Sequence, residues 1–170
     1  MVYKIRLILN IEEDTIRDVA IDGSSSLEDL HNAITSSFGF AGDEMASFYR
    51  SDESWIQGEE FPLFDMSDGH DRKIQMSEIS IDQILMSEND KMIYVYDFFN
   101  MWSFYVELIT TDFEHKATEL PSLLFSLGEV PNDAPDIQFE TELLSEDDDD
   151  ISENEFTEGI DEDFMDFNYN

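Results

Sequence analysis

The chain has 170 residues, 41% hydrophobic and 13% aromatic, which is enough apolar material for one folded domain. Its 42 acidic residues face only 8 basic ones, giving a formal net charge of −34. Because nucleic acids and anionic membranes attract clustered cations, this composition argues against direct binding to either and favours a basic partner. The absence of cysteine excludes disulfides and thiolate metal sites.

The beginning of the chain predicts a hairpin followed by a helix. The segment YKIRLILNI alternates apolar and polar residues, as a half-buried strand does, and residues 15–22 resume strand-like composition after a short turn. Residues 26–38 then carry apolar side chains at helical spacing. Ser26 is a suitable N-cap and Gly39 a suitable C-terminal stop, so we expect this helix to lie on the hairpin.

The middle of the chain predicts more strands. MASFYRSD and WIQGEEFPL have the composition of short strands, and Ser80 is a possible N-cap of a short second helix. The aromatic stretch at 94–108 predicts an antiparallel hairpin, with Trp102 as a buried anchor and Asp97 held by hydrogen bonds. After residue 117 the pattern weakens and prolines accumulate, so an irregular segment packed over the domain is expected.

These patterns predict a single α+β domain over residues 1–140. Its sheet is expected to be mixed or mainly antiparallel and curled around the helix at 26–38, as in a β-grasp or roll. Residues 141–170 carry 13 acidic residues and no basic one, which predicts a disordered acidic tail. No apolar run is long enough to span a membrane and the start lacks a signal-peptide cleavage site, so we expect a cytoplasmic location.

Four stretches, VYKIRLILN, LEDLHNAITSSFGF, ISIDQIL and YVYDFFNMWSFYVEL, resemble in this order the plasmid pRiA4b ORF-3-like family, also described as passenger proteins of an insertion element. The resemblance spans Tyr3 to Pro131 and is strongest to an acidic branch with an Asp/Glu-rich tail. It implies an α+β fold, association with mobile elements and no particular activity. The family's hairpin motif contains a Gly-Asp turn and a His, which Phe99-Asn100 and Phe104 replace here. Chemistry carried by those family residues is therefore lost in this chain.

Our first functional hypothesis is a noncatalytic interaction module. Its acidic surface and tail would bind a basic protein. In one form of this hypothesis, the acidic surface imitates a nucleic-acid phosphate backbone. In the tail, Phe156, Ile160 and Phe164 are spaced four apart and would align on a helix induced by binding, with Phe167 and Tyr169 adding contacts. The sequence leaves the oligomeric state open.

The second hypothesis is an enzyme of unknown reaction. Asp97 and Glu107 would form a carboxylate acid–base pair across the predicted hairpin. We expect His31 to cap or line the helix, and a closed pocket in which it converged on the two acids would favour this hypothesis. Neighbouring carboxylates are expected by chance in a chain with 42 acids, so this hypothesis ranks second. No HExxH, EF-hand or phosphate-loop motif occurs, and we predict neither a metal nor a cofactor.

Overall fold

The computed structural model describes residues 1–115 and 119–134, which belong to one structural unit. They form one antiparallel sheet, one α-helix and two short 3₁₀ helices. The strands are β1 (Val2–Leu9), β2 (Ile16–Asp22), β3 (Ala46–Arg50), β4 (Glu60–Pro62), β5 (Lys91–Tyr96), β6 (Trp102–Thr110) and β7 (Ser122–Leu127), and the helices are α1 (Leu27–Phe38), η1 (Met76–Glu78) and η2 (Ile81–Gln83).

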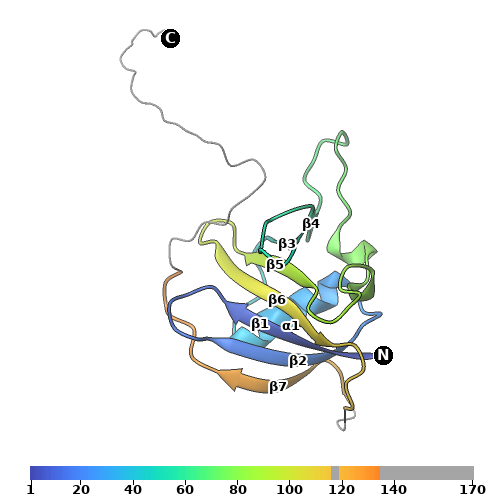
Figure 1. Cartoon of the computed structure of the whole chain (residues 1–170). Helices are drawn as coiled ribbons and strands as arrows, with labels where there is room; N and C mark the ends of the chain where they lie inside the picture. Colours follow the sequence, from blue (N-terminus) through green and yellow to red (C-terminus); the bar gives the residue numbers. More distant parts are fainter. Residues whose placement is uncertain (116–118, 135–170) are drawn as a thin grey trace. The chain divides into compact units, whose positions relative to one another are not determined.

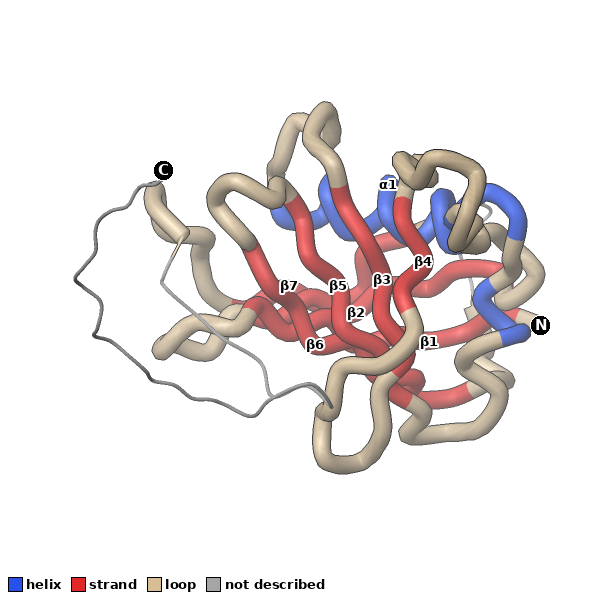
Figure 2. The backbone as a smooth tube through the Cα atoms, turned by 90° about the horizontal axis from the view of Figure 1, so that it is seen from above, coloured by secondary structure: helices blue, strands red, loops and turns tan. Residues whose placement is uncertain are grey.

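The seven strands follow the order β4-β3-β5-β6-β1-β2-β7, and each pairs antiparallel with its neighbours. Figures 1 and 2 show α1 lying across one face of this sheet, with β4 and β7 at its two edges. The prediction of an α+β fold with a mainly antiparallel sheet and one principal helix is confirmed. Its finer part, a sheet curled around the helix as in a β-grasp or roll, stays a prediction, as does the domain boundary at residue 140.

The N-terminal hairpin forms as its period-two pattern predicts. In β1, residues alternate between buried and half-buried positions, and Ile5 lies opposite Val19 of β2. The buried side chains point to the face covered by α1, because apolar residues two apart in a strand share a face. They are Tyr3, Ile5, Leu7 and Leu9.

The helix α1 begins and ends where its caps predict. The Ser26 hydroxyl accepts a hydrogen bond from the Asp29 N–H at 3.1 Å, and the Asp29 carboxylate accepts one from the Ser26 N–H. Gly39 ends the helix in the left-handed conformation, with φ of +82°. The apolar stripe of α1 packs on the sheet, and it consists of Leu27, Leu30, Ala33, Ile34 and Phe38.

The aromatic stretch forms the antiparallel pair β5–β6, in which Tyr96 lies opposite Trp102. Trp102 is 7% exposed, and its ring centroid lies 5.1 Å from that of Phe40. This confirms the predicted anchor. The short helix expected after Ser80 is present as the 3₁₀ turn η2.

The C-terminal part of the described chain differs from the prediction of an irregular segment. Residues 122–127 form strand β7, which pairs with β2 and places Leu127 opposite Ile16. Proline excludes a central strand only where it falls inside the run, and here Pro121 precedes the strand while Pro131 follows it. The number of prolines in the whole segment is therefore misleading, because the six residues between Pro121 and Pro131 that form β7 contain none and can pair with β2.

Replacing Trp102 by alanine should lower the free energy of unfolding by about 3–5 kcal/mol, the usual cost of truncating a buried aromatic side chain. Phe99, in the turn of the same hairpin, is 93% exposed and provides a matched control. Phe99→Ala should cost less than ~0.5 kcal/mol, as exposed sites generally do. Denaturant melts measure both variants, and equal losses would contradict the buried position of Trp102.

Candidate functional site

Asp97 shapes the turn between β5 and β6. It is 8% exposed and has a φ of +66°. Its carboxylate accepts hydrogen bonds from the backbone N–H groups of Phe99 (3.1 Å) and Asn100 (3.3 Å) and from the Asn100 side-chain amide (2.6 Å). Bonds of this kind stabilise turns. The predicted role of Asp97 as a hydrogen-bonded polar residue of the hairpin agrees with this geometry.

Glu107 lies at the other end of the same hairpin. It stands opposite Lys91, whereas the turn containing Asp97 follows the pair of Tyr96 and Trp102. Five residues of strand separate the two ends, which corresponds to roughly 17 Å at the usual rise per residue. The Glu107 carboxylate instead faces the Lys91 ammonium at 3.6 Å. The structure does not bring Asp97 and Glu107 together, so the enzyme hypothesis gains no geometric support.

His31 is buried under the sheet, with 2% of its surface exposed. Its Nδ1 lies 2.6 Å from the Tyr94 hydroxyl. Burial lowers the pKa of His31 and raises the pKa of Tyr94, so both groups are neutral at pH 7. A neutral pair joined by a hydrogen bond inside the core fits a structural role.

A polar cluster that the sequence did not reveal lies on the sheet face opposite α1. It consists of Ser47 and Tyr49 on β3, Glu60 on β4 and Lys73 in the following loop. The Ser47 hydroxyl donates to Glu60 Oε2 at 2.6 Å, and Lys73 Nζ donates to Glu60 Oε1 at 2.6 Å. The Tyr49 hydroxyl lies 3.5 Å from Glu60 Oε2. One carboxylate thus joins two strands and a loop.

The surroundings of Glu60 fix its charge. Burial alone raises the pKa of the Glu60 carboxyl, but the hydrogen bonds from Lys73 and Ser47 outweigh burial, and the net pKa lies below its ordinary value of 4.5. Burial, assisted by the Glu60 charge, raises the pKa of Tyr49 to about 12. At neutral pH the cluster therefore holds one ionised carboxylate and one protonated phenol.

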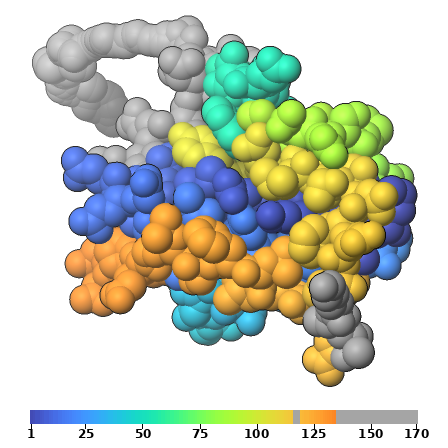
Figure 3. All heavy atoms as spheres, turned by 60° about the horizontal axis from the view of Figure 1, so that its bottom comes forward, coloured from blue at the N-terminus to red at the C-terminus, as the bar shows by residue number. Residues whose placement is uncertain are grey.

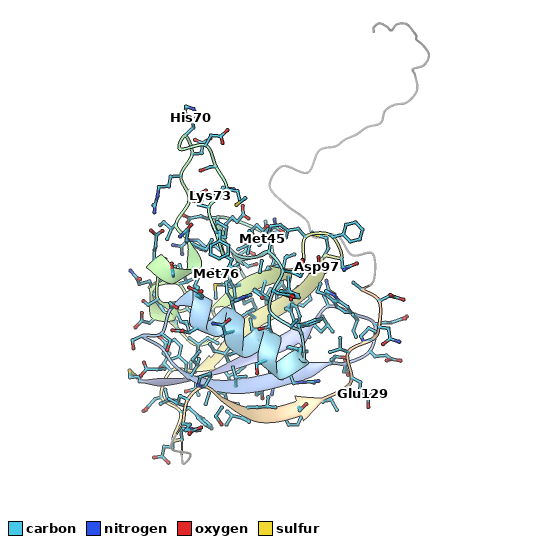
Figure 4. The ribbon with its side chains drawn as sticks, turned by 180° about the vertical axis from the view of Figure 1, so that it is seen from behind. Met45, His70, Lys73, Met76, Asp97 and Glu129 are labelled. Carbon is cyan, nitrogen blue, oxygen red and sulfur yellow. The ribbon has the colours of Figure 1, made fainter. Side chains whose placement is uncertain are left out.

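A cavity of about 250 Å³ opens beside this cluster, with Glu60 and Lys73 in its wall. Ser47 is completely buried and donates to a carboxylate that its neighbours keep ionised, so its hydroxyl is not presented to this cavity as a nucleophile. Figure 4 shows Lys73, Met45 and Asp97 toward the same end of the sheet. The other side chains that line the cavity are Met45, Pro62, Phe64, Asp65, Met66, Ser67 and Phe98.

No spacing rule would have found this cluster. Ser47 and Tyr49 share a strand face, and that alternation is visible in the sequence. Glu60 and Lys73 are 13 residues apart, however, and Lys73 lies in a loop. Their contact depends on how the loop folds back over the sheet, which local patterns do not encode.

The cations of the described residues are almost all engaged within the chain. Five of the seven form salt bridges with carboxylates, and Arg17 donates to the carbonyl oxygens of Ile16, Ser37 and Leu127. Lys4 lies over the ring of Phe113. The salt bridges are Arg6–Asp18, Arg50–Glu59, Arg72–Glu78, Lys73–Glu60 and Lys91–Glu107.

The surface therefore carries carboxylates without counter-charges. Over residues 1–115 and 119–134 the sequence places 27 acidic residues against these 7 cations. In the same residues, no group of three or more His, Cys, Asp or Glu side chains is arranged to hold a metal ion. No helix in this part of the chain is long and apolar enough to cross a membrane. The predicted partner-binding residues Phe156, Ile160, Phe164, Phe167 and Tyr169 lie outside the described residues.

The comparisons with known proteins identify a family and a similar fold. The family model described as plasmid pRiA4b ORF-3-like protein matches residues 1–170. No curated protein matches the chain. Among solved structures, a protein of unknown function from Methanosarcina mazei Go1 is similar with a TM-score of 0.62 and 19% identity, over 78% of this chain and 73% of that chain. At this identity the similarity shows the fold alone.

The Glu60 cluster predicts a pH-dependent stability. Because the folded-state pKa of Glu60 is lowered, its stabilisation is present above its unfolded value of 4.5 and is lost as the pH falls through the folded pKa. Glu60→Gln should therefore be less stable than the native chain by ~1 kcal/mol at neutral pH, and the difference should vanish in acid.

Urea melts at pH 7 and about pH 3 measure this difference. Glu59→Gln is the matched control, since Glu59 pairs with Arg50 on the exposed surface, where an ion pair contributes less than ~1 kcal/mol. A Glu60→Gln difference that is the same at both pH values would contradict the ionised cluster.

Proposed function

Because the chain belongs to the plasmid pRiA4b ORF-3-like family, whose description names no reaction, we propose a function from the chemistry of its own residues. The protein is a noncatalytic interaction module, and its acidic surface and C-terminal tail bind a basic protein. The separation of Asp97 from Glu107 and the burial of His31 favour this module over the enzyme hypothesis.

One observation carries the proposal: five of the seven described cations are already paired with carboxylates of the chain, while most of the described carboxylates have no such partner. Arg17 is 8% exposed and bound to carbonyl oxygens, so it neutralises no surface acid. The exposed carboxylates Glu12, Glu13 and Asp14 take part in no salt bridge among the described residues. Uncompensated charge of one sign attracts partners of the opposite sign and speeds their association.

The tail extends the same chemistry. Its 13 acidic residues are accompanied by no Lys or Arg. A segment of this composition attracts a basic partner over long range, and the bulky residues Phe156, Ile160 and Phe164 then supply apolar contacts. We therefore assign the tail to the speed of association and its apolar residues to the lifetime of the complex.

The test begins with capture from native cell extract, using the full chain and a chain ending after Glu140 as baits. The captured basic protein is then purified, and its association rate and affinity for each bait are measured by surface plasmon resonance at several salt concentrations. We expect affinity for the full chain to fall as salt rises, because the attraction is screened. The shortened chain should bind more slowly and with less salt dependence, while its thermal midpoint stays unchanged.

Two outcomes would contradict the module. One is the absence of any recurrent basic protein; the other is a captured protein whose affinity does not respond to salt. Unfolding of the domain on truncation after Glu140 would show that the tail belongs to the core instead. Duplex DNA added as a competitor tests the special case of nucleic-acid mimicry: displacement of the chain supports mimicry, and simultaneous binding excludes it.

A further inference from the structure

The two edges of the sheet differ in how they are protected. β4 is three residues long, contains Pro62, and carries Glu60 in a salt bridge to Lys73. A short strand, a proline and a charge are common means of preventing a further strand from pairing. β7 is six residues long, and its sequence SLLFSL contains neither proline nor charge. Among the described residues no strand pairs with its outer side.

Three of the four exposed side chains of β7 are apolar, and the fourth is Ser126. Leu123 is 51% exposed, and Phe125 and Leu127 are each 45% exposed. Figure 3 shows the residues of β7, in orange, along the surface beside the N-terminal hairpin, in blue. Within the described residues, a shift in register between the pairs Asp18–Phe125 and Val19–Leu123 interrupts the regular edge. The regular part of the edge therefore runs from Phe125 toward the end of the strand.

Exposed acids lie near that end of β7, where the largely buried Arg17 guanidinium also donates to the Leu127 carbonyl. Gly128 lies so close to the β1–β2 loop that a Cβ on it would collide with the Asp14 carbonyl. Glu129 follows directly, and Figure 4 shows it where the strand ends. Glu12, Glu13 and Asp14 in the loop are all exposed, as is Glu129. An uncharged strand edge thus leads into an acidic cluster.

We propose that the edge of β7 is a docking site for an extended segment of a basic protein, which pairs with Phe125–Leu127 as an added strand and places Lys or Arg beside the acids at its end. This inference rests on the proposed function and names the surface that it uses. Strand addition takes its affinity from backbone hydrogen bonds and its specificity from alternate side chains. Here the apolar side chains of Phe125 and Leu127 would contact apolar residues of the added strand.

Electrostatics favour a basic segment over two other candidate occupants of the β7 edge, a second copy of the chain and the chain's own residues 135–170. A second copy of the chain would bring another net charge of −34 to the same acids. The chain's own residues 135–170 include acids but no Lys or Arg, so they would be repelled as well. A basic segment is the occupant that the acidic cluster attracts.

The experiment uses the full chain and a synthetic peptide in which lysine and valine alternate. The control peptide has the same sequence with N-methylated valines, which keeps the charge but removes N–H groups that an added strand needs. We expect the control peptide to bind at least ~10-fold more weakly. Hydrogen exchange should slow at Phe125–Leu127 with the unmodified peptide only.

Two double variants locate the site. Phe125→Ala with Leu127→Ala should weaken binding of the unmodified peptide ~10-fold. Phe64→Ala with Met66→Ala removes two exposed apolar side chains from the loop after β4 and should leave binding unchanged. Thermal melts of both variants verify that each remains folded.

The outcomes separate this inference from the proposed function. Equal binding of the two peptides, or loss of binding in neither double variant, overturns docking at β7 while leaving the acidic module intact. Absence of binding by either peptide overturns both. Sedimentation that shows a dimer disrupted by the Phe125 and Leu127 changes would assign the edge to a second copy. Exchange at β7 that speeds up on truncation after Glu140 would assign it to the chain's own C-terminal residues.

Discussion

The scarcity of positive charge is the constraint on which the rest of this structure depends. Asp18 on β2 is 2% exposed, and a buried carboxylate is tolerable only when it is paired and hydrogen-bonded. Arg6 on the neighbouring strand β1 supplies the opposite charge and the hydrogen bonds. Its Nε and Nη2 each donate to a separate Asp18 oxygen at 2.8 Å. A bidentate pair of this kind also fixes the register between the two strands. The Arg6 cation is therefore already paired with a carboxylate of the chain.

Arg17 is likewise engaged within the fold, but through carbonyl oxygens and an aromatic ring. Its guanidinium stacks 4.8 Å from the centre of the Phe38 ring and donates to Ser37 at the C-terminal end of α1 and to Leu127 at the end of β7. A cation at this position complements the negative end of the helix dipole. One side chain thus ties the helix to β2 and to the edge strand. Because the few cations are engaged within the chain, most surface carboxylates remain uncompensated, and the proposed binding of a basic partner rests on this property.

Local patterns in the sequence predict most of the fold. The hairpin β1–β2, the capped helix α1 and the pair β5–β6 each follow from residues close together in the chain, where alternation, capping and turn chemistry act. β7 is harder to predict for two reasons: prolines flank it, and its neighbour β2 lies roughly a hundred residues earlier, so only the folded sheet brings the two strands together.

The candidate sites show the same limit. The sequence predicts a pair of Asp97 and Glu107 because both lie in one hairpin, but the strand register, which periodicity alone does not specify, places them at opposite ends. The cluster around Glu60 is real but depends on a loop that carries Lys73 over the sheet. The net negative charge can be predicted from the sequence, since it depends on composition and not on the fold. Composition does not predict which carboxylates or carbonyl oxygens the cations bind.

The central claim is that the carboxylates of the native surface lack counter-charges within the chain. The most direct test is the thermal unfolding midpoint of the full chain as sodium chloride rises from about 0.02 to about 0.5 M, a range over which screening lengths shorten severalfold. Self-repulsion of like charges destabilises the compact state, so the account predicts a midpoint that climbs steadily with salt. A midpoint that stays flat or falls would contradict it, because the carboxylates would then be compensated within the folded chain.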